Sequence, residues 1–407
     1  MACFVRILSP PRPIQRAVTS LLGVQAVFNS TGHRLEIPDI VSGEGSYLVD
    51  GEGKRYLDLE SGVWCTSLGH GNQRVNEVIR AQIDILTHAG FCYSNPVVEE
   101  AAKSVLAVCG MEDGSAVFLC SGSEGIDYAR QAVRAITERN RLVTFHDAYL
   151  GSLSSARDHA GNWFVIDWET CEFCPDRGRA IDCDHLDDIP DDVSEFLFEP
   201  GSSSGQVRFA PVPLVRKVVD LVRSKGGKII ANEVTTGIGR TGSWFGHDHY
   251  GISPDLIVIG KGIGNGYPVS IVAMNASTSR ELESAEFRYM QSHQNDPLGA
   301  SVAKEVISVI RDDELIERGA RIGPSFLSAL ESLATHPAVV DVRGRGLMFA
   351  VDLRDELTGG EVFRSLLERG FIVGHRGATL RMDPALTIDE NEFMAFVDVF
   401  SEVVGAL

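Results

Sequence analysis

One lysine of this chain follows an apolar run, where a primary amine can become a nucleophile or a base. Leu256–Gly260 predicts a buried strand, and Lys261 comes directly after it in a glycine-rich loop. Desolvation at the end of such a strand lowers the pKa of a lysine amine and frees it for chemistry. Glycines let a ligand come close to the backbone. Lysines are usually solvated surface groups, so this setting makes Lys261 the first candidate for catalysis.

A second strand end could hold an anion. Ala116–Cys120 predicts a strand, and the turn Ser121-Gly122-Ser123 leads from it into a helix over Gly125–Glu138. The free N–H groups of a helix start, together with serine hydroxyls, form a site for phosphate. The same turn also fits an ordinary helix N-cap, and it lacks the Gly-Lys-Ser/Thr of a nucleotide P-loop.

A third strand ends in polar side chains. Lys228–Glu233 predicts a buried strand whose alternation places Asn232 and Glu233 on opposite faces. The plain alternative for Asn232 is an amide that only satisfies its own strand end. An amine, an anion site and a polar strand end on one sheet match the needs of a cofactor that carries both an aldehyde and a phosphate.

The elements that must position these groups follow an α/β pattern. Short apolar runs alternate with helical periodicity from about residue 72 to 290, which indicates a mostly parallel sheet with helices on both faces. Further strands are expected at Arg141–Phe145 and Glu195–Glu199, and a helix at Pro213–Lys225. Ligands of such sheets bind at the carboxyl ends of the strands.

A length of 407 residues predicts more than one domain. Residues 1–60, an N-terminal arm followed by a hairpin at 43–60, are assigned to a small domain. Residues 61–297 form the expected large domain. Residues 298–407 begin with a helix over Leu298–Arg311 and complete the small α+β domain.

Composition argues against several kinds of partner and site. The net charge of −19 disfavours nucleic acid and anionic membranes, and no apolar run approaches the ~20 residues that span a bilayer. Eight cysteines without a secretory signal indicate reduced thiols in the cytoplasm. Cys171 and Cys174 have the spacing of zinc ligands, and Cys183 and His185 are near, but no second such pair exists. We therefore expect no metal.

A series of short motifs occurs in the order typical of one enzyme family. The motifs are Gly45-Ser-Tyr-Leu-Val-Asp50, Leu68-Gly-His70, Ser121-Gly-Ser-Glu124, Phe145-His146, Glu199-Pro200, Gly237-Ile-Gly-Arg-Thr-Gly242, Lys261 with its glycines, Asp296-Pro-Leu298, Val342–Met348 and Leu380–Leu386. In these motifs, from about Gly43 to Ile388, the chain resembles the class III (ω-) aminotransferases. These are pyridoxal-phosphate (PLP) enzymes of fold type I.

The resemblance implies roles for individual residues. Lys261 would carry PLP as a Schiff base and move the substrate proton, and Phe145 would stack on the pyridine ring. Arg381 would bind a substrate carboxylate in a pocket lined by Trp64, and Ser292 would reach the phosphate of a partner subunit, which implies a homodimer. The remaining implied cofactor-binding residues are Ser121, Gly122, Ser123, His146, Glu199, Asn232 and Val234.

The chain departs from the family pattern around the cofactor. The family has Asp at the position of Asn232, where a carboxylate keeps the pyridine nitrogen protonated. It often has Gly at the positions of Asp147, Gln294 and Asn295, so polar side chains are expected to crowd the site. The leading hypothesis is amino-group transfer from an amine or amino acid to a keto acid or aldehyde. Epimerisation, β/γ-elimination or replacement, carbon–carbon bond formation and a non-catalytic PLP-binding protein stay open as alternatives.

Overall fold

The structure is a computed structural model that describes residues 27–153, 162–168, 184–203 and 206–407. Residues Ile40–Leu407 form one compact unit. The described part of the preceding segment contains a local turn, in which Asn29 Oδ1 accepts a hydrogen bond of 2.8 Å from the hydroxyl of Thr31. Residues 40–407 contain every described residue of the candidate site.

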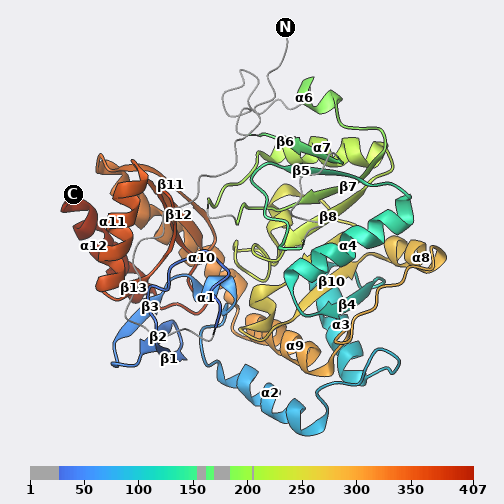
Figure 1. The fold of residues 1–407 in the computed structure, drawn as a ribbon, viewed down its shortest axis with the longest axis horizontal. Coiled ribbons are helices and arrows are strands. Elements are labelled where there is room, and N and C mark those ends of the chain that lie inside the picture. The colour runs from blue at the N-terminus through green and yellow to red at the C-terminus, as the bar shows by residue number, and fades with distance from the viewer. Residues whose placement is uncertain (1–26, 154–161, 169–183, 204–205) are drawn as a thin grey trace. The chain divides into compact units, whose positions relative to one another are not determined.

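A seven-stranded sheet organises the part of this unit that holds Lys261 (Figure 1). The strand order is β4-β10-β9-β8-β7-β5-β6. Neighbours from β9 to β6 are parallel, whereas β10 runs antiparallel to both β4 and β9. The strands are β4 Ser115–Leu119, β5 Arg141–Phe145, β6 Trp163–Ile166, β7 Val193–Phe198, β8 Lys228–Glu233, β9 Leu256–Ile259 and β10 Ser270–Met274.

The predicted, mostly parallel sheet is confirmed, and its central strands lie where the apolar runs placed them. The limits of β5 and β8 agree with the prediction at both ends. Residues of β7 and β9 are buried throughout, and strands buried on both faces read as continuous apolar runs. The strands β6 and β10 were not predicted; β6 is an edge strand in which only Ile166 is buried.

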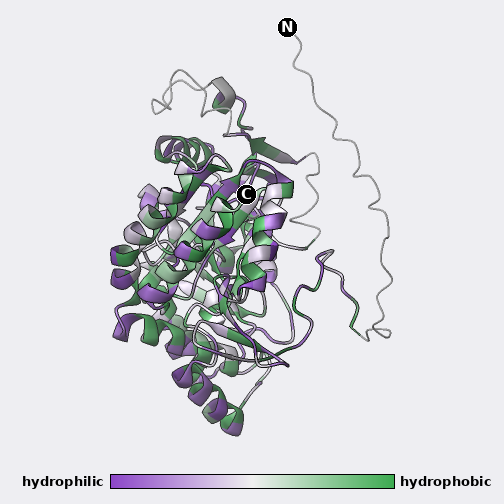
Figure 2. Ribbon diagram, turned by 90° about the vertical axis from the view of Figure 1, so that its left-hand side faces the viewer, coloured by the Kyte–Doolittle hydropathy of each residue, from purple (hydrophilic) through white to green (hydrophobic). Residues whose placement is uncertain are grey.

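Helices cover both faces of this sheet, as expected (Figure 1). Residues of α4 (Gly122–Thr137) pack on one face against Leu197, Ile230 and Val258. Residues of α7 (Val212–Ser224) pack against Phe196 and Phe198, which point the other way along β7. Several helices are accordingly hydrophobic on one side and hydrophilic on the other (Figure 2). The other helices of this part are α2 Gln73–Ile85, α3 Pro96–Cys109, α6 Asp184–Asp187, α8 Ala276–Ser284, α9 Pro297–Asp312, η2 Gly246–Tyr250 and η3 Lys261–Gly264.

Two four-stranded sheets lie in the other part of the unit. One has the order β1-β2-β3-β13, so the N-terminal hairpin pairs with a strand from near the C-terminus. The other has the order β11-β12-β15-β14. The strands are β1 Ile40–Glu44, β2 Tyr47–Asp50, β3 Arg55–Asp58, β11 Val339–Arg345, β12 Met348–Leu353, β13 Phe371–Ile372, β14 Gly374–Arg376 and β15 Thr379–Met382. The helices are α1 Ser61–Trp64, α10 Leu315–Glu331, η4 Ser332–Thr335, α11 Glu356–Glu368 and α12 Glu390–Gly405. The predicted limits of the large domain, residues 61 and 297, stay a prediction.

Candidate active site

A cavity of about 150 Å³ lies beside Lys261, next to the ends of several strands of the large sheet. Two of its walls, Asn232 and Glu199, belong to or directly follow neighbouring parallel strands, which is where ligands of such sheets bind. The cavity therefore brings together most of the predicted cofactor residues. Its lining residues are Ser121, Gly122, Ser123, Ile126, Tyr149, Gly151, Glu199, Asn232, Val234, Thr235 and Lys261.

Lys261 starts the short helix η3 with an unusual backbone conformation. Its φ is +48°, a left-handed value that costs a non-glycine residue about 1–3 kcal/mol and often occurs at functional sites. Its Nζ donates a hydrogen bond of 3.0 Å to Thr235 Oγ1 and lies 4.2 Å from the centre of the Trp64 ring. Burial lowers the pKa of this amine, and the nearby carboxylate of Glu199 opposes that shift. The predicted desolvated lysine is thus present.

The turn after β4 combines a helix N-cap with a wall of the cavity. Ser121 Oγ accepts a hydrogen bond from the N–H of Glu124 (3.2 Å), so this hydroxyl has the ordinary capping role. Gly122 begins α4, and a Cβ added there would lie 2.6 Å from Val234 Cγ1. Ser123 Oγ accepts a hydrogen bond from the N–H of Ser152 (3.0 Å). The start of this 16-residue helix therefore faces the cavity without a side chain at Gly122.

The backbone of Tyr149 connects Glu199 and Asn232, the acidic and amide side chains that line this cavity among the described residues. The N–H of Tyr149 donates to Glu199 Oε2 (2.8 Å), and the carbonyl of Tyr149 accepts from Asn232 Nδ2 (2.8 Å). Glu199 also accepts a hydrogen bond of 2.5 Å from Ser203 Oγ. Burial raises the pKa of Glu199 to about 7, although these hydrogen bonds and Lys261 pull it down.

The aromatic residue of this cavity is Tyr149 and not Phe145. Phe145 is buried in the core, where its ring packs edge-on against Phe196 and Phe198. It is the last residue of β5 and points into that core cluster, so it does not line the cavity. The hydroxyl of Tyr149 is 2.8 Å from Ser152 Oγ, which fixes the tyrosine side chain at the cavity. The sequence signal that could have identified it is an aromatic residue two positions before a glycine, in Tyr149-Leu150-Gly151.

Several other polar residues do not reach the cavity either. His146 Nδ1 lies 3.5 Å from Asp167, and Asp147 accepts a hydrogen bond of 3.0 Å from the indole of Trp168. Gln294 lines a separate surface hollow. Asn295 has a φ of +60° and its Oδ1 accepts from the N–H of Phe118 (2.9 Å). None of these side chains lines the cavity of its own chain, and the expected crowding of the site stays a prediction.

Arg381 and Trp64 lie together, as the resemblance implied, but Arg381 is already paired. Its guanidinium carbon is 3.7 Å from the centre of the Trp64 ring. Its Nη2 donates to Glu60 Oε1 (2.5 Å) and its Nε to Asp383 Oδ2 (2.7 Å). The side chain of Asp383 is fully buried, whereas that of Glu60 is 20% exposed. A substrate carboxylate would thus compete with Glu60 for Arg381.

A left-handed turn presents Trp64 to both cations. All four residues of α1, Ser61–Trp64, have positive φ values between 48° and 64°, a conformation that costs roughly 1–2 kcal/mol per non-glycine residue. Asp58 accepts hydrogen bonds of 2.9 Å from the N–H groups of Glu60 and Gly62. Ser61 Oγ donates to the carbonyl of Asp383 (2.6 Å). These contacts hold the turn, and its strain is the kind that persists at ligand sites.

Other predicted features lie apart from the cavity or outside the described residues. Ser292 is exposed and does not line the cavity of its own chain. Cys171, Cys174 and Cys183 lie outside the described residues, as does the side chain of His185. In the described ranges the free cysteines are Cys65, Cys92, Cys109 and Cys120, and the cytoplasmic location stays a prediction. No helix of the described residues is long and apolar enough to cross a membrane.

The cavity fits a phosphate-bearing heterocyclic aldehyde such as PLP. It offers a desolvated amine at Lys261, a helix start without a Cβ at Gly122, and an aromatic side chain at Tyr149. Helix starts bind phosphate, and the absence of a Cβ at Gly122 lets Val234 pack against this helix start, since a Cβ there would lie 2.6 Å from Val234 Cγ1.

Comparisons with known proteins agree on one family. The sequence model of the class-III aminotransferases matches residues 29–161 and 173–404. The acetylornithine aminotransferase of Archaeoglobus fulgidus is 30% identical over 368 residues, which cover 88% of this chain and 94% of that protein. The LysW-aminoadipate semialdehyde/glutamate semialdehyde transaminase of Sulfolobus acidocaldarius is 28% identical over 345 residues, covering 84% and 88%. A Bacillus anthracis aminotransferase structure has a TM-score of 0.86 at 23% identity, covering 92% of this chain and 96% of that one, and its fold is the same.

Proposed function

Since this chain belongs to the class-III aminotransferases, we propose that it transfers an amino group from an amino acid or amine to a keto acid or aldehyde, using PLP bound at Lys261. The observation that carries the proposal is Lys261, a desolvated amine at a cavity that also contains Glu199 and the start of α4. The family favours amino transfer over the other PLP reactions considered above and over a non-catalytic role.

When bound, PLP supplies an aldehyde that accepts the amino group and a ring that withdraws electrons. Lys261 would hold that aldehyde, and its released amine would then move the proton at the substrate carbon. Glu199 lies close enough to influence the amine electrostatically. Trp64 covers Lys261 Nζ at 4.2 Å and helps to exclude water from it.

The start of α4, with Gly122 and Ser123, would bind the phosphate. Tyr149 would pack on the ring from one side and Val234, which also lines the cavity, from the other. Asn232 would lie at the ring nitrogen, where an amide supplies a dipole and no charge. These assignments follow the lining of the cavity, and the position of Asn232 follows the family resemblance.

We propose that substrates carry a carboxylate that Arg381 binds after Glu60 gives way. The named relatives act on acetylornithine and on semialdehydes of aminoadipate and glutamate, which all carry a carboxylate. Arg381→Lys keeps the charge and loses the guanidinium fork. We expect it to raise KM for carboxylate substrates about tenfold, which corresponds to ~1.4 kcal/mol of a charged hydrogen bond.

Glu60→Gln removes the competing carboxylate and should lower the same KM several-fold. Steady-state kinetics with carboxylate substrates, together with the PLP dissociation constant, provides the measurement.

In both of these variants the PLP dissociation constant should stay as in the wild type, because neither side chain lines the cavity. A KM that is unchanged in both variants would remove Arg381 from the substrate site. If Arg381→Lys raises KM for simple amines as much as for carboxylate substrates, the cause is a packing defect at Trp64. That outcome would also remove Arg381 from the substrate site.

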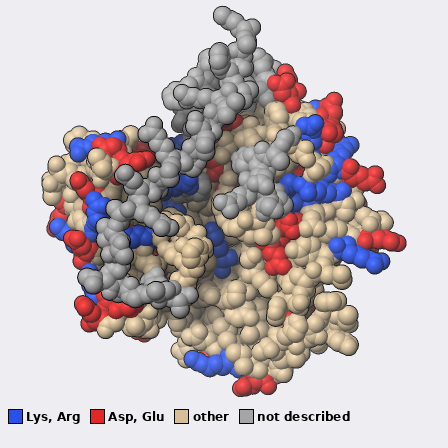
Figure 3. Space-filling view, viewed as in Figure 1, with Lys and Arg blue, Asp and Glu red and all other residues tan. Residues whose placement is uncertain are grey.

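We also propose that the enzyme is a homodimer in which Ser292 reaches the partner's phosphate site. Phe91 and Met290 are 57% and 79% exposed and line one surface hollow, next to the exposed Ser292. The surface over α3 and α9 carries few charged side chains in the view of Figure 3. Large exposed apolar groups of this kind indicate an interface, and a second copy is the occupant that the Ser292 assignment requires.

For this interface we expect Met290→Asp to shift the sedimentation of the protein from dimer toward monomer and to reduce activity with it. Leu357→Asp is the matched control. Leu357 is a similarly exposed apolar residue (81%), but it lies in α11, away from the proposed interface. Ser292→Ala should leave the dimer intact and weaken PLP binding roughly tenfold, the loss of one hydrogen bond to a charged group. A fully active monomer would contradict the proposal.

A screen of amino donors tests the proposed reaction itself. Each donor, with its amino nitrogen isotopically labelled, is added to the PLP-loaded enzyme without an acceptor. We expect the corresponding keto acid or aldehyde in amounts equal to the enzyme, and the labelled nitrogen on the cofactor released by denaturation. Release of ammonia, or loss of the α-hydrogen without nitrogen transfer, would instead indicate elimination or epimerisation.

A further inference from the structure

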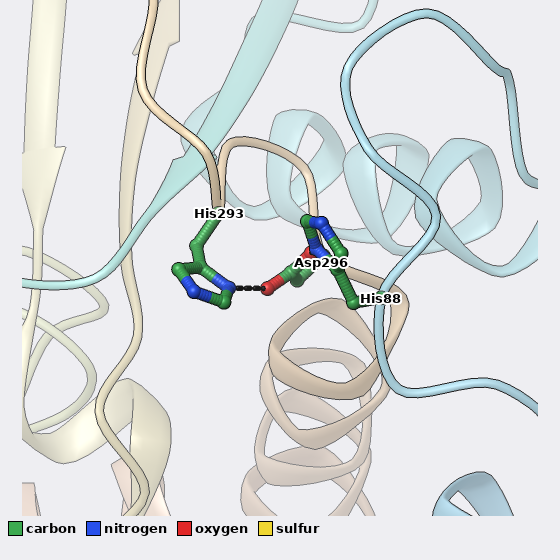
Figure 4. Close-up of side chains that lie close together, drawn as sticks. All are labelled: His88, His293 and Asp296. Atoms are coloured by element: carbon green, nitrogen blue, oxygen red, sulfur yellow. Dashed lines mark hydrogen bonds and ion pairs between the residues drawn. The ribbon is translucent and has the colours of Figure 1, made fainter.

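Two histidines and an aspartate from separate segments meet on the surface near the start of α9. His88 lies between α2 and α3, whereas His293 and Asp296 lie just before α9 (Figure 4). His88 Nδ1 is 2.5 Å from Asp296 Oδ1, and His293 Nδ1 is 2.6 Å from Asp296 Oδ2. The two imidazole ring centres are 5.0 Å apart. One carboxylate therefore already holds both imidazoles.

The three side chains offer the donor atoms that zinc-class cations prefer. Imidazole nitrogen and carboxylate oxygen are both good ligands for Zn²⁺, and open zinc sites use three protein ligands with water in the fourth position. The ligand atoms all lie within 4.8 Å of one another. In the single chain the exposed fractions of the His88, His293 and Asp296 side chains are 42%, 60% and 18%, so small rotations can bring them to zinc distances.

An approach path for an ion also exists. A hollow of about 240 Å³ is lined by His293 and Asp296, together with the thiol-bearing Cys120. The Cys120 thiol also contacts the segment that carries His293, because Gln291 Nε2 lies 3.9 Å from Cys120 Sγ. A cation that enters this hollow thus meets imidazole and carboxylate, with a soft thiol nearby.

We propose that His88, His293 and Asp296 bind one divalent transition-metal ion of the zinc class per chain. The ion takes the place of the hydrogen bonds between the imidazoles and Asp296, each neutral imidazole keeps its proton on the other ring nitrogen, and the ion ties the segment after α2 to the segment that leads into α9. This differs from the expectation of a chain without metal sites. No ligand lines the cavity at Lys261 of its own chain, and ion binding is measured without turnover, so failure of this site is distinguishable from failure of the proposed function.

The test uses the PLP-loaded protein in its native oligomeric state, free of any affinity tag, at a pH where imidazole is neutral. Zn²⁺ is titrated by calorimetry, and Co²⁺ by its visible absorption, which reports ligand type and geometry. We expect one ion per chain with a dissociation constant of about 10 μM or tighter. His293→Gln and His88→Gln should each weaken binding at least tenfold, and Zn²⁺ should raise the melting temperature of the wild type but not of these two variants.

His375→Gln is the matched control, because His375 is also an exposed histidine but lies in β14. It should bind Zn²⁺ as the wild type does. Zinc held at Cys171 and Cys174 would persist in the His88 and His293 variants, so the difference from wild type reports this cluster alone. Wild type and both variants binding Zn²⁺ equally, or no saturable binding below about 1 mM, overturns the proposal.

Discussion

Lys261→Ala is expected to abolish turnover and to remove the visible absorption of covalently held PLP. The reason is that Lys261 supplies the only lysine amine that lines the described cavity. Loss of a residue that serves as both nucleophile and proton carrier should cost at least ~10³-fold in kcat. Reduction with borohydride followed by denaturation measures the covalent attachment, since only a reduced lysine–cofactor bond survives unfolding.

This variant should fold, because alanine has the same Cβ as lysine at the left-handed φ and the amine makes one hydrogen bond, to Thr235. Lys304→Ala is the matched control. Lys304 lies in α9, pairs with Glu100 and does not line the cavity, so it should leave attachment and kcat unchanged. A Lys261→Ala protein that stays yellow after reduction and denaturation would assign the attachment to another residue.

Asn232→Asp should change both the cofactor and the fold. Asn232 Nδ2 donates to the carbonyl of Tyr149, and a carboxylate there would face that carbonyl oxygen at about the same 2.8 Å. We expect the free energy of unfolding of the PLP-free protein to fall by ~1–3 kcal/mol at neutral pH, the cost of a buried polar group without its partner. Protonation of the new Asp side chain restores a hydrogen-bond donor to the Tyr149 carbonyl, so the pKa of this carboxyl should be raised. The loss of stability should therefore shrink as the pH falls.

The second effect of this substitution concerns the PLP ring nitrogen. Beside the neutral amide of Asn232 the nitrogen should be largely unprotonated, whereas an ionised Asp would favour its protonation, by ~1.4 kcal/mol for each pKa unit. Ring-nitrogen NMR on labelled PLP, together with the rates of amino transfer from simple amino acids, measures this change. We expect Asn232→Asp to protonate the nitrogen and to accelerate those transfers.

The amide of Asn265 provides a control for the effect on stability alone. It donates to the carbonyl of Gly69 at 3.1 Å and does not line the cavity. Asn265→Asp should therefore lose stability for the same reason without protonating the ring nitrogen. A protonated nitrogen in the wild type, or transfer rates that Asn232→Asp leaves unchanged, would show that Asn232 does not control the cofactor.

The sequence by itself determined the mostly parallel character of the large sheet, the family, and the position of Lys261 at the end of an apolar strand. Strands buried on both faces are continuous apolar runs, so β5 and β8 could be placed from local sequence, and Lys261 followed from the end of such a run. The motif order along the chain identified the aminotransferase family, to which the chain belongs. The apolar runs are local in sequence, and the family motifs are recognised by their order along the chain. Neither signal depends on how distant segments pack together.

Only the tertiary structure decided which side chains face one another. Glu60 meets Arg381 across 321 positions, and His88 meets Asp296 across 208, and no periodicity links residues so far apart. Tyr149 replaces Phe145 at the cavity because β5 ends with Phe145 pointing into the core and the chain then turns, a rotation that loop sequence does not encode. The identity of the side chains around the proposed substrate carboxylate and cofactor ring is therefore set by the tertiary packing.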